Sequence, residues 1–229
     1  MSTDVEMAVQ PDEVASPPAP SHNLRQILVV VLAIAAVVAA AGLGYIWGDR
    51  NQPARVSPTS VDAGFARDMS THHQQAITMA GFVRDHTANP SIKTLAFDIE
   101  TQQYFQLGEM QGWLDSWGLS RTGGYQPMAW MGHSHAQLGP NGLMPGMATP
   151  DQMTRLERLS GSELDVYFLQ LMLHHHQGGL PMAQYAAEHA SLPYVRDLAQ
   201  KMSTAQTNEI VTMEQMLRER NAAPLPAPS

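Results

Sequence analysis

A repeat within the chain constrains its fold more than any other feature. Residues 65–114 align without a gap on residues 168–217, at a constant offset of 103 positions. Helical spacing of apolar residues would repeat leucine and alanine by chance, but the identical pairs also include His72/His175, His73/His176, His86/His189, Met69/Met172, Met79/Met182, Met110/Met213, Gln74/Gln177 and Gln103/Gln206. The repeat therefore predicts a duplicated structural unit that carries a histidine and methionine constellation of the metal-binding kind.

Each copy of the repeat has the sequence pattern of two helices joined by a short turn. Ser57-Pro58 is a cap followed by a proline, which predicts a helix from there to about His86. Asn89-Pro90 predicts the start of the next helix, whose apolar residues recur at spacings of three and four. In the second copy, Thr149-Pro150 begins a short helix, and Gly161 separates it from the second hairpin.

Two such hairpins, each with an apolar face that it cannot bury alone, predict an all-α fold. We expect a ferritin-like four-helix bundle with approximate twofold symmetry. The predicted domain covers residues 58–220, with repeat one at 58–116, a Met/His-rich connector at 117–149 and repeat two at 150–220. Residues 1–25 and 221–229 are predicted to be disordered tails, and residues 49–57 a linker.

An uncharged segment at residues 26–48 predicts one transmembrane helix before the domain. At about 1.5 Å per residue it spans the hydrocarbon core, and Tyr45 and Trp47 stand where interfacial aromatics are expected. The alternative is a cleaved signal peptide, for which the alanines at 39–41 would be the cleavage region. The length of the segment and the acidic, Pro-rich sequence before it favour the anchor.

Composition excludes several classes of function. The chain has no cysteine, which excludes disulfides, thiolate zinc sites and Fe–S clusters. Its net charge is −8, so no nucleic-acid partner is expected. The sequence also lacks a Glu-x-x-His di-iron motif, a nucleophile elbow and a nucleotide-binding loop, so we do not expect an enzyme.

The helical histidines and methionines are the candidate metal ligands. On an ideal helix His72, Met79 and His86 form one stripe, with Met69 and His73 beside it, and the second repeat places His175, Met182, His189, Met172 and His176 in the same way, with His174 on the flank. Thioether and imidazole without thiolate is the ligand set expected for Cu(I). The alternative is that the methionines fill the core, while His86 and His189 cap helix ends. Gln103 and Gln206 are expected to hydrogen-bond the imidazoles.

The connector carries a second, looser set of candidate ligands. A flexible Gly/Pro-rich loop of this composition predicts a weaker metal site made by Met128, Met131, His133, His135, Met144 and Met147. The alternative is a plain loop in which these residues have no common role.

The segments FARDMSTHHQQAITMA and FLQLMLHHHQGGLPMA, with LAFDIETQQYFQLGEMQGWL and GLMPGMAT, resemble the DUF305 family of bacterial helical proteins. The resemblance covers residues 61–217 and implies an extracytoplasmic ferritin-like domain, secreted or membrane-anchored. It also implies copper binding through Met and His. The ligands would be Met69, His72, His73, Met79, His86, Met172, His175, His176, Met182 and His189. This chain departs from the family pattern at Gly178-Gly179, which replaces a bulkier pair, and at Pro181, where we expect a kink.

These observations predict a single-pass membrane protein whose large C-terminal domain lies outside the cell and sequesters or transfers Cu(I). Thioethers remain competent ligands where thiols would oxidise, which favours an extracytoplasmic location. The alternative is a structural or interaction protein that docks on a membrane complex and has no metal role. A third possibility is a metal-dependent oxidoreductase, which would require a metal with an open coordination position and measurable catalytic turnover. The predicted partners are the membrane, through residues 26–48, and a metal ion.

Overall fold

The structure is a computed structural model that describes residues 22–50, 56–132, 138–139 and 141–228. It divides into two compact units, residues 1–53 and 54–229. Residues 1–21 of the tail predicted at 1–25 and residues 51–55 of the predicted linker lie outside the described residues, while residues 22–25 belong to a helix.

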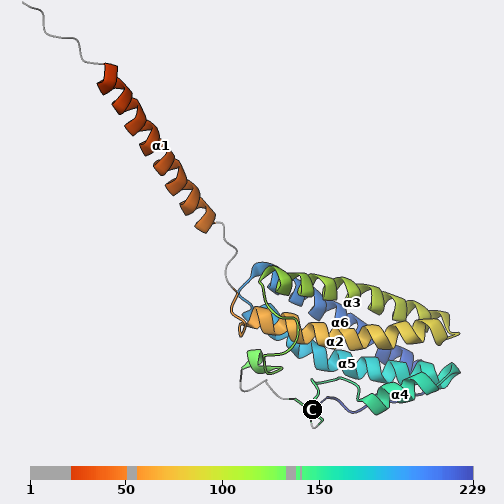
Figure 1. The fold of residues 1–229 in the computed structure, drawn as a ribbon. Coiled ribbons are helices and arrows are strands. Elements are labelled where there is room, and N and C mark those ends of the chain that lie inside the picture. The colour runs from red at the N-terminus through yellow and green to blue at the C-terminus, as the bar shows by residue number, and fades with distance from the viewer. Residues whose placement is uncertain (1–21, 51–55, 133–137, 140, 229) are drawn as a thin grey trace, which may run out of the picture. The chain divides into compact units, whose positions relative to one another are not determined.

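The first unit contains one helix, α1 (His22–Arg50), which includes the predicted transmembrane segment (Figure 1). Its stretch Asn23–Tyr45 has a mean hydropathy of 2.9 and is long and apolar enough to cross a membrane. The apolar side chains on this stretch are exposed rather than packed in a core. Near the N-terminus, such a helix fits a membrane anchor or a signal sequence.

The second unit is helical, with no strand among its described residues. Its elements are α2 (Val61–His86), α3 (Pro90–Ser116), the short 3₁₀ helix η1 (Ala129–Met131), α4 (Pro150–Arg158), α5 (Gly161–His189) and α6 (Pro193–Glu219) (Figure 1). Helices α2 and α3 pack as one hairpin, α5 and α6 as the other, and α2 meets α5 between them. The prediction of an all-α fold made of two repeated hairpins is confirmed.

Helix starts follow the local sequence closely. Asn89 caps α3 by accepting hydrogen bonds from two backbone N–H groups of the first turn, and Thr149 forms a capping box at the start of α4. The start of α2 differs from the prediction, because Ser57-Pro58 lies in a turn and Ser60 is the capping residue. Helix α5 continues from Gly161 to His189 through Pro181.

The buried side chains form two apolar clusters, one toward each end of the bundle. The Val83 cluster combines the C-terminal half of α2 with the N-terminal half of α5, including Met79, Val83, Phe168 and Met172. The Trp130 cluster combines the other two halves with the connector, including Phe65, Met69, Trp130 and Met182. Helices α2 and α5 are therefore antiparallel. On both helices, the histidine pairs stand between the residues of the two clusters.

Part of the connector folds back onto α2. One carboxylate oxygen of Asp68 accepts hydrogen bonds from the backbone N–H of Met128 at 2.6 Å and from the indole N–H of Trp130 at 2.7 Å. Further along, the side-chain amide of Gln75 accepts from the N–H of Ala148 at 2.7 Å and donates to its carbonyl at 2.8 Å. These contacts hold Met128, Trp130 and Ala148 of the connector against the bundle.

The C-terminal segment after α6 was predicted to be disordered, and residues 222–228 have no regular secondary structure. They nevertheless lie along α5, where Gln170 donates to the carbonyl of Ala223 at 2.7 Å. Leu225 packs against the Val83 cluster. A hydrogen bond to a backbone carbonyl and an apolar contact thus attach this Pro-rich segment to the bundle.

Candidate metal centre

Four histidines lie in the centre of the bundle, between the two apolar clusters. His72 and His73 come from α2, His175 and His176 from α5, and each is 0% exposed. We call these four residues the histidine layer. Each pair follows a buried methionine by three residues on the inward face of its helix, so the helical register that buries the methionines also buries the histidines.

The inner pair of the layer joins the two repeats directly. The ring centroids of His72 and His175 are 3.7 Å apart, with the ring planes inclined by 36°. His175 donates from Nε2 to the backbone carbonyl of His72 at 3.0 Å. His72 donates from Nε2 to the carbonyl of Pro145 in the connector at 3.1 Å. Main-chain groups of α2 and the connector thus orient both rings.

The outer pair is held by polar residues of the second helix in each hairpin. His73 donates from Nε2 to Oε1 of Gln106 at 2.7 Å, and His176 donates from Nε2 to a carboxylate oxygen of Glu209 at 2.6 Å. Gln106 and Glu209 are equivalent positions of the repeat. Since a ligating histidine usually donates its other N–H to a carboxylate or carbonyl, both arrangements match a metal-binding environment.

These partners correct one expectation from the sequence. Gln103 and Gln206 were predicted to bond the imidazoles, but their Oε1 atoms are buried without a hydrogen-bond partner among the described residues. The actual partners lie one helical turn later. Sequence identity could not reveal them because glutamine stands in one repeat and glutamate in the other. The available signal was that Gln106 and Glu209, both polar, stand at equivalent positions of the repeat.

The hydrogen bonds fix the tautomer of all four rings. Because each Nε2 donates, the neutral ring carries its lone pair on Nδ1. All four Nδ1 atoms are buried and have no hydrogen-bond partner among the described residues. A buried polar atom without a partner costs about 1–3 kcal/mol, so four of them in one layer are a costly arrangement for a protein that only needs a core.

Burial keeps three of these imidazoles, His72, His73 and His175, neutral. It lowers the pKa of His72 to about 4 and the pKa of His73 to about 3, although the hydrogen bonds to Pro145 and Gln106 act in the opposite direction. Burial, and then the neighbouring His72, place the pKa of His175 well below the ordinary value. At neutral pH these three rings present lone pairs rather than charges.

Close backbone packing covers the layer on the connector side. A Cβ on Gly178 would lie 2.1 Å from the carbonyl oxygen of Pro145, and one on Gly146 would lie 2.6 Å from the carbonyl oxygen of His174. A Cβ on Gly179 would lie 2.9 Å from Cε1 of His72. Gly178 therefore lets the connector approach α5, and Gly179 places no side chain of its own against His72.

The predicted methionine ligands lie on both sides of the layer. Met69 and Met182 belong to the Trp130 cluster, Met79 and Met172 to the Val83 cluster, and all four are 0% exposed. The structure thus brings these thioethers into the core, one to two helical turns along α2 and α5 from the imidazoles.

His86 and His189 lie elsewhere. Each hydrogen-bonds through Nδ1 to the carbonyl four residues earlier, at 2.7 Å for His86 and 2.9 Å for His189. Each also stacks on the aromatic ring of that earlier residue, Phe82 or Tyr185. About 14 residues of helix, or roughly 21 Å, separate each from its repeat's inner histidine. This is the helix-end arrangement that the sequence left open as an alternative.

The connector methionines are packed rather than loose. Met128, Met131 and Met144 are 2%, 3% and 6% exposed, and Met147 is half-buried against the same Trp130 cluster. This differs from the flexible loop expected from the Gly/Pro-rich sequence. His133 and His135 lie outside the described residues.

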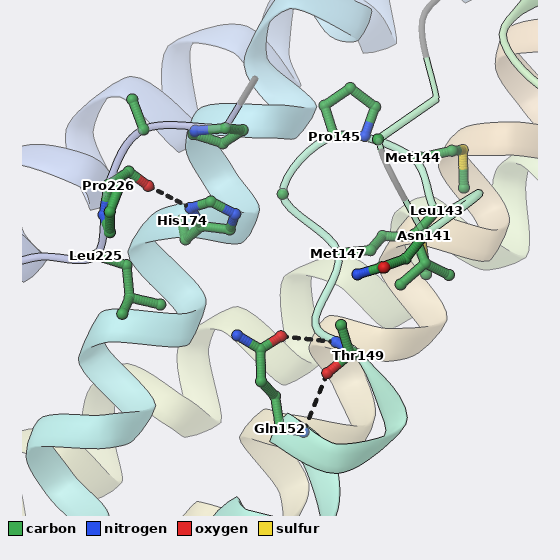
Figure 2. A pocket seen from close by; sticks show the side chains of 14 residues that line it. Asn141, Leu143, Met144, Pro145, Met147, Thr149, Gln152, His174, Leu225 and Pro226 are labelled. Carbon is green, nitrogen blue, oxygen red and sulfur yellow. Dashed lines mark hydrogen bonds between the residues drawn. The ribbon is translucent and has the colours of Figure 1, made fainter.

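A cavity of about 310 Å³ lies between the connector, α5 and the C-terminal segment. Figure 2 shows Pro145 and Met147 on its connector side, with His174 and Pro226 opposite. His174 donates from Nδ1 to the carbonyl of Pro226 at 2.9 Å, so this histidine ties the C-terminal segment to α5. It is the surface neighbour of the buried His175.

In the part of the chain that the structure describes, carboxylates and imidazoles do not by themselves form a preassembled metal site. Among the described residues, no group of three or more His, Asp or Glu side chains is placed to hold one ion. What the layer provides is a set of buried ring nitrogens, with thioethers in the adjacent clusters.

Sequence comparison identifies a family for the domain. Residues 62–217 match the sequence model of DUF305, described as a domain of unknown function. No curated protein matches the chain significantly.

Solved structures of the same fold support this match. A DUF305 protein from Streptomyces coelicolor shares 43% identity, with a TM-score of 0.68, covering 74% of this chain and 99% of that one. A DUF305 fragment from Deinococcus radiodurans shares 28% identity, with a TM-score of 0.58, covering 71% and 97%. CopM, solved in a Cu(I)-bound form, has the same fold at 24% identity, with a TM-score of 0.52, covering 69% and 96%. From its repeat, its helical hairpins and the match over most of its length, the chain belongs to the DUF305 family.

Proposed function

We propose that the protein binds Cu(I) inside the bundle, through the histidine layer and the methionines beside it, and thereby sequesters or transfers the ion. The observation that carries this proposal is the set of four buried Nδ1 atoms that have no hydrogen-bond partner among the described residues. A metal ion would satisfy donors that otherwise destabilise the core.

The donor chemistry favours a soft ion. Imidazole nitrogen and thioether sulfur suit Cu(I), whereas Mg²⁺ and Ca²⁺ require oxygen ligands. The ligands we assign are His72, His73, His175 and His176, with Met69, Met79, Met172 and Met182 as the available thioethers. CopM, which shares the fold, has been solved with Cu(I), with Cu(II) and with silver, and Ag(I) is a soft ion too.

We assign the location from α1. An uncleaved α1 would anchor the chain as a single-pass protein with the DUF305 domain outside the cell. The apolar stretch Asn23–Tyr45 supports this assignment. The relative from Streptomyces coelicolor is described as a candidate secreted protein, which agrees with an extracytoplasmic domain. N-terminal sequencing of the mature protein distinguishes an anchor from a cleaved signal, since cleavage would remove α1.

The experiment is a Cu(I) competition titration on the full chain in detergent, under anaerobic conditions, with a chromophoric Cu(I) chelator as competitor. Replacing His72, His73, His175 and His176 together by alanine should abolish the tightest binding. The matched control is His86→Ala with His189→Ala, which removes the repeat-equivalent histidines at the helix ends. This control should keep the stoichiometry and affinity.

A second variant set tests the thioethers without opening cavities. Met→Leu keeps most of the side-chain volume and removes the sulfur, so the bundle should remain folded by circular dichroism. We expect Met69→Leu with Met172→Leu to weaken Cu(I) binding and to leave Zn(II) binding unaffected. If the fourfold histidine variant is folded and keeps full Cu(I) affinity, the histidines are core residues and the proposal is wrong.

A further inference from the structure

The outer face of α3 carries aromatic side chains that the described residues leave more than half exposed. Phe97, Tyr104 and Phe105 are 52%, 53% and 74% exposed. With Thr101, Gly108 and Gly112 they follow one another at helical spacing on the side of α3 opposite its buried residues. We call these six residues the α3 stripe. A water-exposed helix face does not need three aromatic rings.

The second repeat provides an internal comparison. At the equivalent positions, the outer face of α6 has Gln200, Thr204, Thr207, Asn208, Val211 and Gln215. The same helix in the same fold can therefore present a mainly polar face to solvent. The aromatic and glycine residues of the α3 stripe are specific to the first repeat, and the fold itself does not require them.

The glycines of the stripe are not required by packing within the chain. A Cβ on Gly108 or Gly112 would meet no atom within 4 Å, apart from the helix's own backbone and adjacent residues. A glycine in a helix interior costs roughly 1 kcal/mol relative to alanine. Beside them, Thr101, Tyr104 and Phe105 line a hollow of about 330 Å³ with Arg84 and Glu100. Along the α3 stripe, exposed aromatic side chains thus stand beside glycines and a hollow that could accommodate a large side chain.

We propose that the α3 stripe is the contact between two copies of this chain, whose α3 helices pack antiparallel around a twofold axis between residues 104 and 105. In this register Phe97 and Thr101 each meet a glycine, and the two rings next to the axis meet each other. Phe97 faces Gly112 of the second copy, and Thr101 faces Gly108 of the second copy. Tyr104 faces Phe105 of the second copy across the axis. The same pairs recur on the other side of the axis, as a twofold contact requires.

The size of the stripe is suited to such a contact. Its three aromatic side chains expose together about 350 Å² per protomer, taking about 200 Å² for a fully exposed ring. A standard stable interface buries about 800 Å² per partner. The aromatic residues alone supply nearly half of that area, and the rest would have to come from the helix surface around them.

The absence of cysteine from the chain makes the register directly testable. Thr101→Cys and Gly108→Cys chains are prepared separately at full length in detergent, mixed, and oxidised. A disulfide needs Cβ atoms about 4 Å apart, which only the proposed register provides for this pair. We expect several-fold more disulfide-linked dimer from the mixture than from Thr101→Cys alone.

The repeat provides the matched control, a mixture of Thr204→Cys and Val211→Cys on α6. This control also accounts for any proximity created by association of α1. Equal cross-linking of the α3 and α6 mixtures would overturn the proposal. So would failure of the mixture to exceed Thr101→Cys alone, which would contradict the register.

Light scattering gives a second measurement without cysteines. Phe105→Glu places a charge in the stripe, and its exposed position means that the fold should survive, which circular dichroism verifies. This variant should lose the dimer mass, whereas Asn208→Glu on α6 should keep it. If Phe105→Glu keeps the dimer mass but loses binding to phosphatidylcholine vesicles, the stripe contacts lipid and the proposal is wrong.

Discussion

The neutral state of the buried histidines predicts that the metal-free domain loses stability on mild acidification. The pKa of His72 is about 4 and that of His73 about 3 in the folded chain, against 6.5 in the unfolded chain. Between 6.5 and these values the unfolded chain binds protons that the folded chain does not, so stability falls as the pH falls. From about pH 7.5 to about pH 5, each of the two should cost about 2 kcal/mol. His175 adds a loss of the same sign.

The measurement is chemical unfolding of the chelator-treated full chain, followed by circular dichroism across that pH range. We expect the free energy of unfolding to fall by about 4 kcal/mol from His72 and His73 together. In the variant His73→Leu the free energy of unfolding should depend less steeply on pH, because the larger of the two pKa shifts is removed. The control is His86→Ala with His189→Ala, which removes two histidines and leaves the histidine layer intact.

Carboxylates also titrate in this range, so the difference in slope between His73→Leu and the unsubstituted chain is the decisive quantity. A free energy of unfolding that is level between about pH 7.5 and about pH 5 would refute the reasoning. Equal slopes for His73→Leu and the unsubstituted chain would do the same. Either result would mean that the folded histidines bind protons as readily as the unfolded ones.

Two further predictions concern the connector. Asp68→Ala should free Met128 and Trp130 from α2, lower the free energy of unfolding by about 2–4 kcal/mol, and shift the tryptophan fluorescence to longer wavelength, both measured in one denaturation series. Gly178→Ala should destabilise the domain by about 1–3 kcal/mol, because the added Cβ would meet the carbonyl of Pro145. In the same thermal unfolding assay Gly81→Ala should be tolerated, since only the end of the Glu100 side chain stands near it.

Most of the helical architecture could be predicted from the sequence because it depends on local signals. Asn89-Pro90 and Thr149-Pro150 mark helix starts through caps that involve only the next few residues. The repeat then supplied the pairing of the hairpins. The start of α2 was the exception, since Ser57 and Ser60 are both competent capping residues and the sequence alone does not rank them.

The details of the site were less accessible because they depend on contacts between distant segments. The bond from His72 to Pro145 joins positions 73 residues apart. The connector looked like a flexible loop because its composition is Gly/Pro-rich, but Asp68 organises it from 60 residues away. The identity of the buried histidines was predictable, whereas their partners Gln106 and Glu209 were not.

The difference between Gln106 and Glu209 makes the two halves of the bundle chemically unequal. A carboxylate that accepts the Nε2 proton of His176 makes that ring a stronger donor than His73, which is bonded to an uncharged amide. Because no atom of the histidine layer reaches solvent, anything that enters or leaves must wait until the helices separate or the connector lifts. For the ion that we propose, the residence time in this core would therefore be governed by the opening rate of the bundle as well as by affinity, and exchange would be slow.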